Sequence, residues 1–123
     1  MQDARNVVSR QNQRLQFTEE ARSGATLFEC RGSFSLVSHD CLDKLVQKMR
    51  RVESRRVVLD MRQVLHMDST GMGTLATAFK DLRAAGKDLV LVPSQEVRSS
   101  LAAVSLDRVF SMKENVESAL GPD

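Results

Sequence analysis

The sequence predicts an α/β fold with a mixed, mostly parallel sheet of four to five strands and about four helices. Its 123 residues suit one domain with a workable core. Short apolar runs alternate with segments whose apolar residues recur at helical spacing, and such alternation requires parallel strands joined by right-handed crossovers. Residues 1–12 are polar and aperiodic, so we expect a flexible N-terminal arm before a single domain over residues 13–123.

Two strands are expected first. Leu15 and Phe17 alternate with polar neighbours and predict a strand, and Ser23-Gly24 predicts the turn after it. Apolar residues of one parity then predict a half-buried second strand that continues past Gly32. These residues are Phe28, Cys30, Phe34 and Leu36.

Two long segments have the apolar spacing i, i+3, i+4, i+7 and i+10 of a helix with one buried face. Ser38 can cap the first, and Asp40 supports its positive N-terminus; its apolar residues are Leu42, Leu45, Val46, Met49 and Val52. Gly86 is placed just beyond the end of the second, whose apolar residues are Met72, Leu75, Ala76, Phe79 and Leu82.

The continuous apolar runs over residues 57–59 and 89–92 predict strands that are covered on both faces. We expect Asp60 to end the first strand at the C-terminal edge of the sheet. Pro93 should end the second.

The last part of the chain predicts smaller elements. Ser94 is placed to cap a short helix whose inward residues are Val97, Leu101 and Val104. Residues 106–110 then return the chain to the sheet as a short strand. Residues 114–120 predict a final helix.

Composition narrows the functional class. Apolar residues make up 41% and charged residues 28% of the chain, as in a folded domain, and a net charge of +2 is too small to indicate nucleic-acid binding. The longest apolar run, residues 89–93, is far shorter than the roughly 20 residues of a membrane-spanning helix. With no visible secretory signal, we expect a cytoplasmic protein without a membrane partner.

Metal and redox motifs are missing from the sequence. Cys30 and Cys41 match neither a CxxC pair nor a zinc motif, so we expect reduced, mostly buried thiols. His39 and His66 add no ligand spacing, so we expect no metal and no cofactor. A basic cluster is expected to be a solvated helix end rather than a phosphate site: Arg50, Arg51, Arg55 and Arg56.

Residues 66–73, HMDSTGMG, are the candidate site. We expect them to form a loop at the carboxyl ends of the strands, where sites gather in open sheets of this kind. Asp68 or Ser69 can cap the following helix, which leaves one hydroxyl exposed at its positive end, and Thr70 adds a further polar group.

The two glycines of this stretch, Gly71 and Gly73, each cost about 1 kcal/mol relative to alanine inside a helix. We expect them to let the backbone of another protein approach closely. Met67 and Met72 would flank the site as flexible apolar surface, which could also seat a homodimer.

Three other interpretations stay open. The stretch could be only a helix cap, with the glycines packing against a neighbouring strand. It could bind a phosphate ligand at the helix N-terminus, although GxxxxGK[ST] and GxGxxG are missing. It could belong to a hydrolase, but there is no GxSxG and no placed triad, so we expect no catalytic residues and no enzyme.

Four pieces occur in order in the second half of the chain: the strand end Leu59-Asp60, the loop DSTGMG, a helix closing on Gly86-Lys87, and the return LDRVF. Within VVLDMRQVLHMDSTGMGTLATAFKDLRAAGKDLVLV and SQEVRSSLAAVSLDRVF, they resemble the STAS domain, the module named for sulfate transporters and anti-sigma factor antagonists. The resemblance covers roughly residues 13–120 and is densest over residues 57–110.

The free-standing anti-sigma factor antagonists of this family imply a function. The resemblance implies phosphorylation at Ser69, with Thr70 as second choice. The unmodified protein would bind an anti-sigma factor that is also a serine kinase, phosphorylation would release it, and a PP2C-type phosphatase would reset it. The implied partner-binding residues are Ser35, Met67, Asp68, Thr70, Gly71, Met72 and Gly73.

One motif departs from the family pattern. Where the family commonly has Gly-Glu-[Leu/Ile/Val]-Asp, this chain has Gly-Ser-Phe-Ser, so Ser33 and Ser35 replace two acids near the partner-facing surface. Asp40 is a candidate to supply part of the missing charge. The alternative function is a constitutive STAS scaffold in a transport or sensory complex.

Overall fold

The computed structural model describes residues 13–121, and the expectation of a flexible arm over residues 1–12 lies outside them. Two 3₁₀ turns, η1 (Leu36–Ser38) and η2 (Leu106–Arg108), accompany the regular elements. In chain order these are β1 (Gln16–Arg22), β2 (Ala25–Phe34), α2 (His39–Arg51), β3 (Arg56–Met67), α3 (Ser69–Ala84), β4 (Asp88–Pro93), α4 (Gln95–Ala103), β5 (Ser111–Met112) and α5 (Val116–Leu120).

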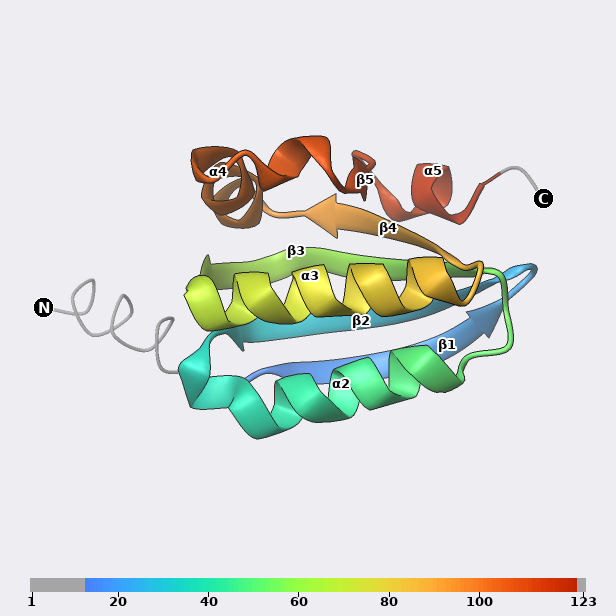
Figure 1. Ribbon diagram of the computed structural model, residues 1–123, viewed down its shortest axis with the longest axis horizontal. Helices are drawn as coiled ribbons and strands as arrows, with labels where there is room; N and C mark the ends of the chain where they lie inside the picture. Colours follow the sequence, from blue (N-terminus) through green and yellow to red (C-terminus); the bar gives the residue numbers. More distant parts are fainter. Residues whose placement is uncertain (1–12, 122–123) are drawn as a thin grey trace, which may run out of the picture.

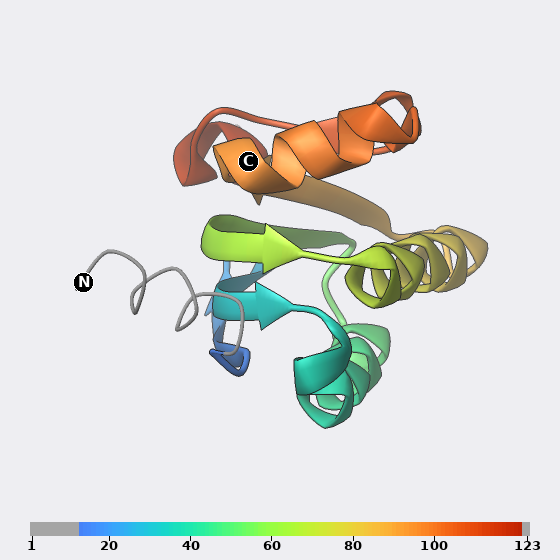
Figure 2. The ribbon, with the colours of Figure 1, turned by 90° about the vertical axis from the view of Figure 1, so that its left-hand side faces the viewer.

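The strands form one sheet in the order β1-β2-β3-β4-β5. β1 pairs antiparallel with β2, and every later pair is parallel. α2 and α3 lie side by side across one face of this sheet (Figure 1), and the turned view places both on the same side (Figure 2). The predicted α/β fold with a mixed, mostly parallel sheet is confirmed.

Apolar residues pack on both faces of the sheet. The larger cluster joins the strands to α2, α3 and α4, and its fully buried members include Phe28, Phe34 and Leu59. A smaller cluster on the other face packs under α5 and contains Leu27, Val58, Val90, Val92 and Ala119. Burial of residues 57–59 and 89–92 on both faces is therefore confirmed. The half-buried second strand is wrong because Leu27 is also buried.

Three expected boundaries are wrong. Asp60 does not end its strand: β3 continues to Met67, because the Arg62 guanidinium binds the buried Asp60 carboxylate at 2.8 and 2.9 Å. Leu36 is not an inward strand residue, since the chain leaves the sheet after Phe34 and Leu36 is 67% exposed in η1. Val104 does not face inward, because α4 ends at Ala103 and Val104 lies beyond its last turn.

Two predicted helix ends are confirmed. Gly86 has a φ of 77°, its N–H donates to the Arg83 carbonyl, and the Lys87 N–H donates to the Leu82 carbonyl, which is the pair of bonds that closes a helix on a left-handed residue. The Ser94 hydroxyl accepts from the Val97 N–H at 3.1 Å and caps α4.

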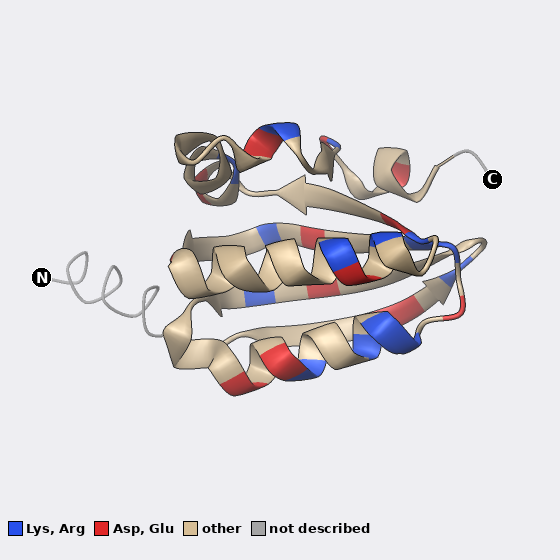
Figure 3. Ribbon diagram, in the orientation of Figure 1, with Lys and Arg blue, Asp and Glu red and all other residues tan. Residues whose placement is uncertain are grey.

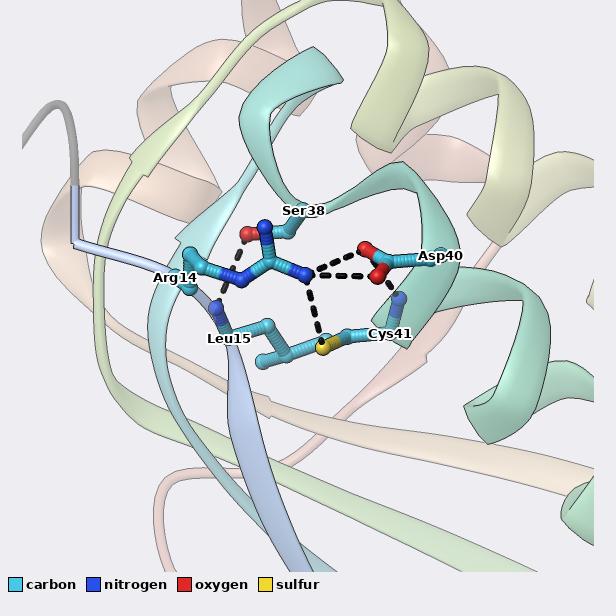
Figure 4. A network of polar contacts seen from close by, with 5 residues as sticks. All are labelled: Arg14, Leu15, Ser38, Asp40 and Cys41. Carbon is cyan, nitrogen blue, oxygen red and sulfur yellow. Dashed lines mark hydrogen bonds and ion pairs between the residues drawn. The ribbon is translucent and has the colours of Figure 1, made fainter.

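Ser38 lies at the N-cap position of α2 as predicted, but the predicted hydrogen bond from its side chain to the helix is not formed. Ser38 occupies the N-cap position, but its buried hydroxyl accepts from the Leu15 N–H at 2.8 Å and makes no cap bond. Beside it, the Arg14 guanidinium donates to both Asp40 oxygens at 2.6 Å (Figure 4). These bonds hold the start of the N-terminal strand against the start of α2.

The Arg14 pair yields a pH prediction. Its hydrogen bond is the main cause that lowers the pKa of the Asp40 carboxyl. In Arg14→Gln we expect this pKa to rise towards its ordinary value near 4, measured by carboxyl carbon NMR. Because the folded-state pKa of Asp40 is depressed, wild type should be more stable than Arg14→Gln above about pH 4. This difference in stability disappears as the pH falls through the lowered pKa. A pKa that stays low in the variant would contradict the assignment.

The cysteines are reduced, with Cys30 buried and Cys41 partly buried. Burial raises the pKa of the Cys30 thiol, with smaller contributions from Asp60 and Glu29. Within residues 13–121, no three metal-ligating side chains gather around one point. No helix of this described region has the length and apolarity needed to cross a membrane.

Candidate functional site

The candidate site lies where β2 and β3 end at one edge of the sheet and α3 begins (Figure 2). β3 ends at Met67, and α3 starts at Ser69, so Asp68 alone joins them. Residues 66–73 are therefore not the expected loop: the first two belong to the strand and the last five to the helix.

Asp68 is the N-cap of α3. One carboxylate oxygen accepts from the Gly71 N–H at 3.1 Å, and the other accepts from the Leu36 N–H at 3.1 Å. The Asp68 N–H donates to the Phe34 carbonyl at 3.2 Å. One side chain thus fixes η1 against the first turn of α3.

Ser69 is the exposed hydroxyl residue of this turn. Because Asp68 performs the capping, the Ser69 side chain lies outside the cap and is open to solvent. Thr70 is partly buried, and its carbonyl accepts from the Thr74 hydroxyl at 3.0 Å. Between the two candidate acceptors, Ser69 is the more accessible, and it stands at the positive end of the helix.

The two glycines have different surroundings. Gly71 is buried, and a Cβ atom built there would lie 2.0 Å from the Phe34 carbonyl oxygen. Its missing side chain therefore lets α3 pack on β2, and it does not open the surface to another protein as expected. Gly73 is exposed, and a Cβ there would meet no atom within 4 Å.

Two further residues expected at the partner surface are buried. Met67 is 7% exposed, so the prediction that it supplies flexible apolar surface is wrong; Met72 is partly buried against the core. The Ser35 hydroxyl lies 2.5 Å from that of Ser33, and both residues are buried. The hydroxyls that replace two acids thus satisfy one another inside the protein, and Asp40 is engaged by Arg14.

The exposed surface of η1 is a feature that the sequence did not predict. Leu36 is 67% and Val37 37% exposed, and the Asp68 bond holds this turn next to Ser69. A signal was present: Leu36 and Val37 are adjacent, so a half-buried strand cannot turn both towards the core. The surface residues that surround the helix start are Leu36, Val37, Ser69, Met72 and Gly73, which we call the η1/α3 surface.

Asp68→Ala is expected to lower the free energy of unfolding by about 2 kcal/mol, because a cap is lost and the Leu36 N–H loses its acceptor. Asp68→Asn keeps one oxygen acceptor and should lose less than the alanine variant. Urea unfolding of both variants tests this order. Equal stability of alanine variant and wild type would contradict the tie between η1 and α3.

The sequence model of the STAS domain matches residues 16–119. Three solved structures resemble this fold. An anti-sigma factor antagonist from Mycobacterium paratuberculosis is 20% identical over 86% of this chain and 91% of its own, with a TM-score of 0.74. The Bacillus cell fate determinant SpoIIAA in its phosphorylated form is 16% identical over 85% and 96%, with a TM-score of 0.64.

The third, a sulfate transporter family protein from Wolinella succinogenes, is 22% identical over 82% of this chain and 85% of its own, with a TM-score of 0.67. These likenesses show that the fold is shared with the three structures. Because the family match spans nearly all of the described residues, the chain belongs to the STAS domain family.

Proposed function

We propose that this protein is an anti-sigma factor antagonist of a partner-switching system. It binds a serine kinase that is also an anti-sigma factor while Ser69 is unmodified, and phosphorylation of Ser69 by that kinase releases it. The observation that carries the proposal is the exposed Ser69 side chain on the first turn of α3, fixed beside exposed Leu36 by the Asp68 carboxylate.

Apolar contact supplies the affinity of the unmodified state. Burying a leucine side chain contributes about 1.5 to 3 kcal/mol, and Leu36 is exposed on the η1/α3 surface. Gly73 leaves room above the helix for a close partner backbone. The rigid tie through Asp68 lets the partner close over Leu36 and Ser69 together.

Phosphorylation changes the surface rather than the fold. A phosphoserine adds about −1.5 to −2 charges at neutral pH. The N-terminus of α3 stabilises that charge by roughly 0.3 to 1 kcal/mol, so the protein stays folded. A partner that closes over the site must instead remove water from an unmatched dianion, which costs several kcal/mol.

The chemistry belongs to the partners. The kinase supplies the ATP and Mg²⁺ sites, and a PP2C-type phosphatase restores the free hydroxyl. The chain itself acts in the cytoplasm as substrate and ligand and is not an enzyme. The similarity to antagonist structures, one of them of a phosphorylated protein, supports this assignment.

Intact mass measurement tests the proposal. Protein recovered from its own cells should contain a species heavier by about 80 Da, the mass of one phosphoryl group, that a serine phosphatase removes. Ser69→Ala should lack this species, whereas Thr70→Ala should keep it. If the heavier species persists in Ser69→Ala and disappears in Thr70→Ala, the acceptor is Thr70.

A constitutive scaffold in a transport or sensory complex is the second candidate, favoured by the similarity to the sulfate transporter family protein. A scaffold predicts a single unmodified mass under all growth conditions and a partner bound equally by wild type and Ser69 variants. A homodimer through the η1/α3 surface would make Leu36→Asp monomeric, which sedimentation measures.

A further inference from the structure

A polar cavity of about 380 Å³ lies on the sheet over β1, β2 and β3. This volume is within the range of small-molecule sites, roughly 300 to 1,000 Å³. Its side chains come from three strands and are mostly polar or charged; those used below are Gln16, Thr18, Glu29, Arg31, Asp60 and Arg62.

The cavity is on the face opposite to α2 and α3. Leu59 packs towards those helices, so its neighbour Asp60 points to the other face, as does Val58 under α5. The α5 cluster covers Leu27 and Val58, and the cavity begins two residues further along each strand, at Glu29 and Asp60. On this face of the sheet, the charged side chains of the cavity therefore begin directly after the apolar residues that α5 covers.

Among residues 13–121, Asp60 is the one charged residue that is buried, and it is 6% exposed. Arg62 holds it by two hydrogen bonds, while the Arg62 side chain itself is about half exposed. An ion pair of this kind contributes little net stability, because desolvation offsets the attraction. Both residues line the cavity, and their pairing satisfies the buried carboxylate.

The charges in this cavity are sorted by sign. Glu29 is the register neighbour of Asp60, and Arg31 lies beyond Glu29 as Arg62 lies beyond Asp60. Figure 3 shows the two acidic positions side by side on β2 and β3, and the two basic positions side by side next to them. Arg62 neutralises the Asp60 carboxylate by direct hydrogen bonds, so the repulsion between Glu29 and Asp60 is offset within the protein.

A bulge contributes to this geometry. Between the pairs Glu29–Asp60 and Arg31–Gln63, β3 contains one residue more than β2. Bulges re-aim side chains and recur beside binding sites. Along β2, the backbone positions of Glu29 and Arg31 are two residues apart, a separation of about 6.6 Å at 3.3 Å per residue.

Two charges remain available to a ligand. The Arg31 side chain hydrogen-bonds Gln16 through Nε at 2.9 Å, and among residues 13–121 its terminal nitrogens have no further partner. Glu29 forms no ion pair within the same residues. Thr18 is the register neighbour of Glu29 and Gln63 that of Arg31, so each of these two charges also has a neutral hydrogen-bonding group beside it.

We propose that the cavity binds a short zwitterion of dipeptide size. Its ammonium group lies at Glu29, and its carboxylate lies at Arg31. The Thr18 hydroxyl and the Gln63 amide add hydrogen bonds beside these two charged groups. The opposite ends of an extended dipeptide are about 6 to 7 Å apart, which matches the separation of the Glu29 and Arg31 positions along β2.

The probe is L-alanyl-L-alanine, titrated into ¹⁵N-labelled protein. We expect saturable shifts of β1, β2 and β3 amides around the cavity and no shift at Ser69. N-acetyl-L-alanyl-L-alanine lacks the ammonium group, the dipeptide amide lacks the carboxylate, and L-alanine is too short. Each should bind at least tenfold more weakly than the dipeptide.

Two variants with matched controls complete the test. Glu29→Gln and Arg31→Gln should each weaken dipeptide binding at least tenfold. Glu19→Gln and Arg22→Gln make the same charge changes on β1 outside the cavity and should leave binding unchanged. A response that does not saturate, or one that the cavity variants leave unaltered, overturns the proposal; neither result bears on the Ser69 switch.

Discussion

Ser69→Asp should weaken the complex with the cognate kinase about a thousandfold, which corresponds to about 4 kcal/mol. The substitution places a carboxylate on the first turn of α3 beside exposed Leu36. The partner that covers Leu36 must then desolvate this charge without a matching cation. Titration calorimetry with the purified kinase measures the change.

Two variants isolate the role of charge. Ser69→Asn has nearly the same size as the aspartate variant without its charge, so it should lose less than tenfold. Ser69→Ala should bind as well as wild type and stay bound when ATP is added. The urea midpoint of Ser69→Asp should not fall, because a helix N-terminus stabilises a carboxylate. Equal affinity of the aspartate and asparagine variants would contradict a switch based on charge.

Gly71→Ala is expected to lower the free energy of unfolding by about 3 kcal/mol. The added Cβ would lie 2.0 Å from the Phe34 carbonyl oxygen, and this neighbour is backbone at the C-terminal end of β2. Either α3 moves away from β2 or the end of β2 shifts, and both loosen the packing of the core. Urea or thermal unfolding measures the loss.

Gly73→Ala is the matched control, two residues along the same helix. Its Cβ would meet no atom within 4 Å, and alanine is favoured over glycine in a helix by about 1 kcal/mol. We therefore expect Gly73→Ala to unfold at a higher urea concentration than wild type. If both variants were destabilised alike, the effect would arise from the helix start in general and not from the contact with Phe34.

Periodicity predicted most of the fold. The apolar spacing of α2 and the closing glycine of α3 each depend on residues near in sequence, so their outcome follows from local physics. Leu42, Leu45 and Met49 are buried as expected. The predicted order of strands and helices is also the observed one, but the short strand predicted over residues 106–110 is misplaced. Residues 106–108 form η2, and β5 follows at Ser111–Met112.

The errors arise from contacts between distant segments. A strand end at Asp60 is expected because an unpaired charge is unfavourable inside a sheet. The sequence does not show that Arg62 will bind the Asp60 carboxylate on the same face. Ser38 caps helices in general, but here the Leu15 N–H, 23 residues away, takes its hydroxyl. Gly71 and Gly73 carry the same cost in helix propensity, so the sequence does not distinguish them. Only the Phe34 carbonyl beside Gly71 shows that Gly71 serves packing, whereas Gly73 faces open space.

Asp68 alone spans the junction of β3 and α3, and both of its carboxylate oxygens are bonded within the fold. The backbone there has no spare segment that could swing when a phosphate arrives. Under the proposed function, the signalling state is therefore defined by whether Ser69 carries the phosphate ester, and not by a change in backbone conformation. The duration of a response is set by the rate at which that ester is hydrolysed.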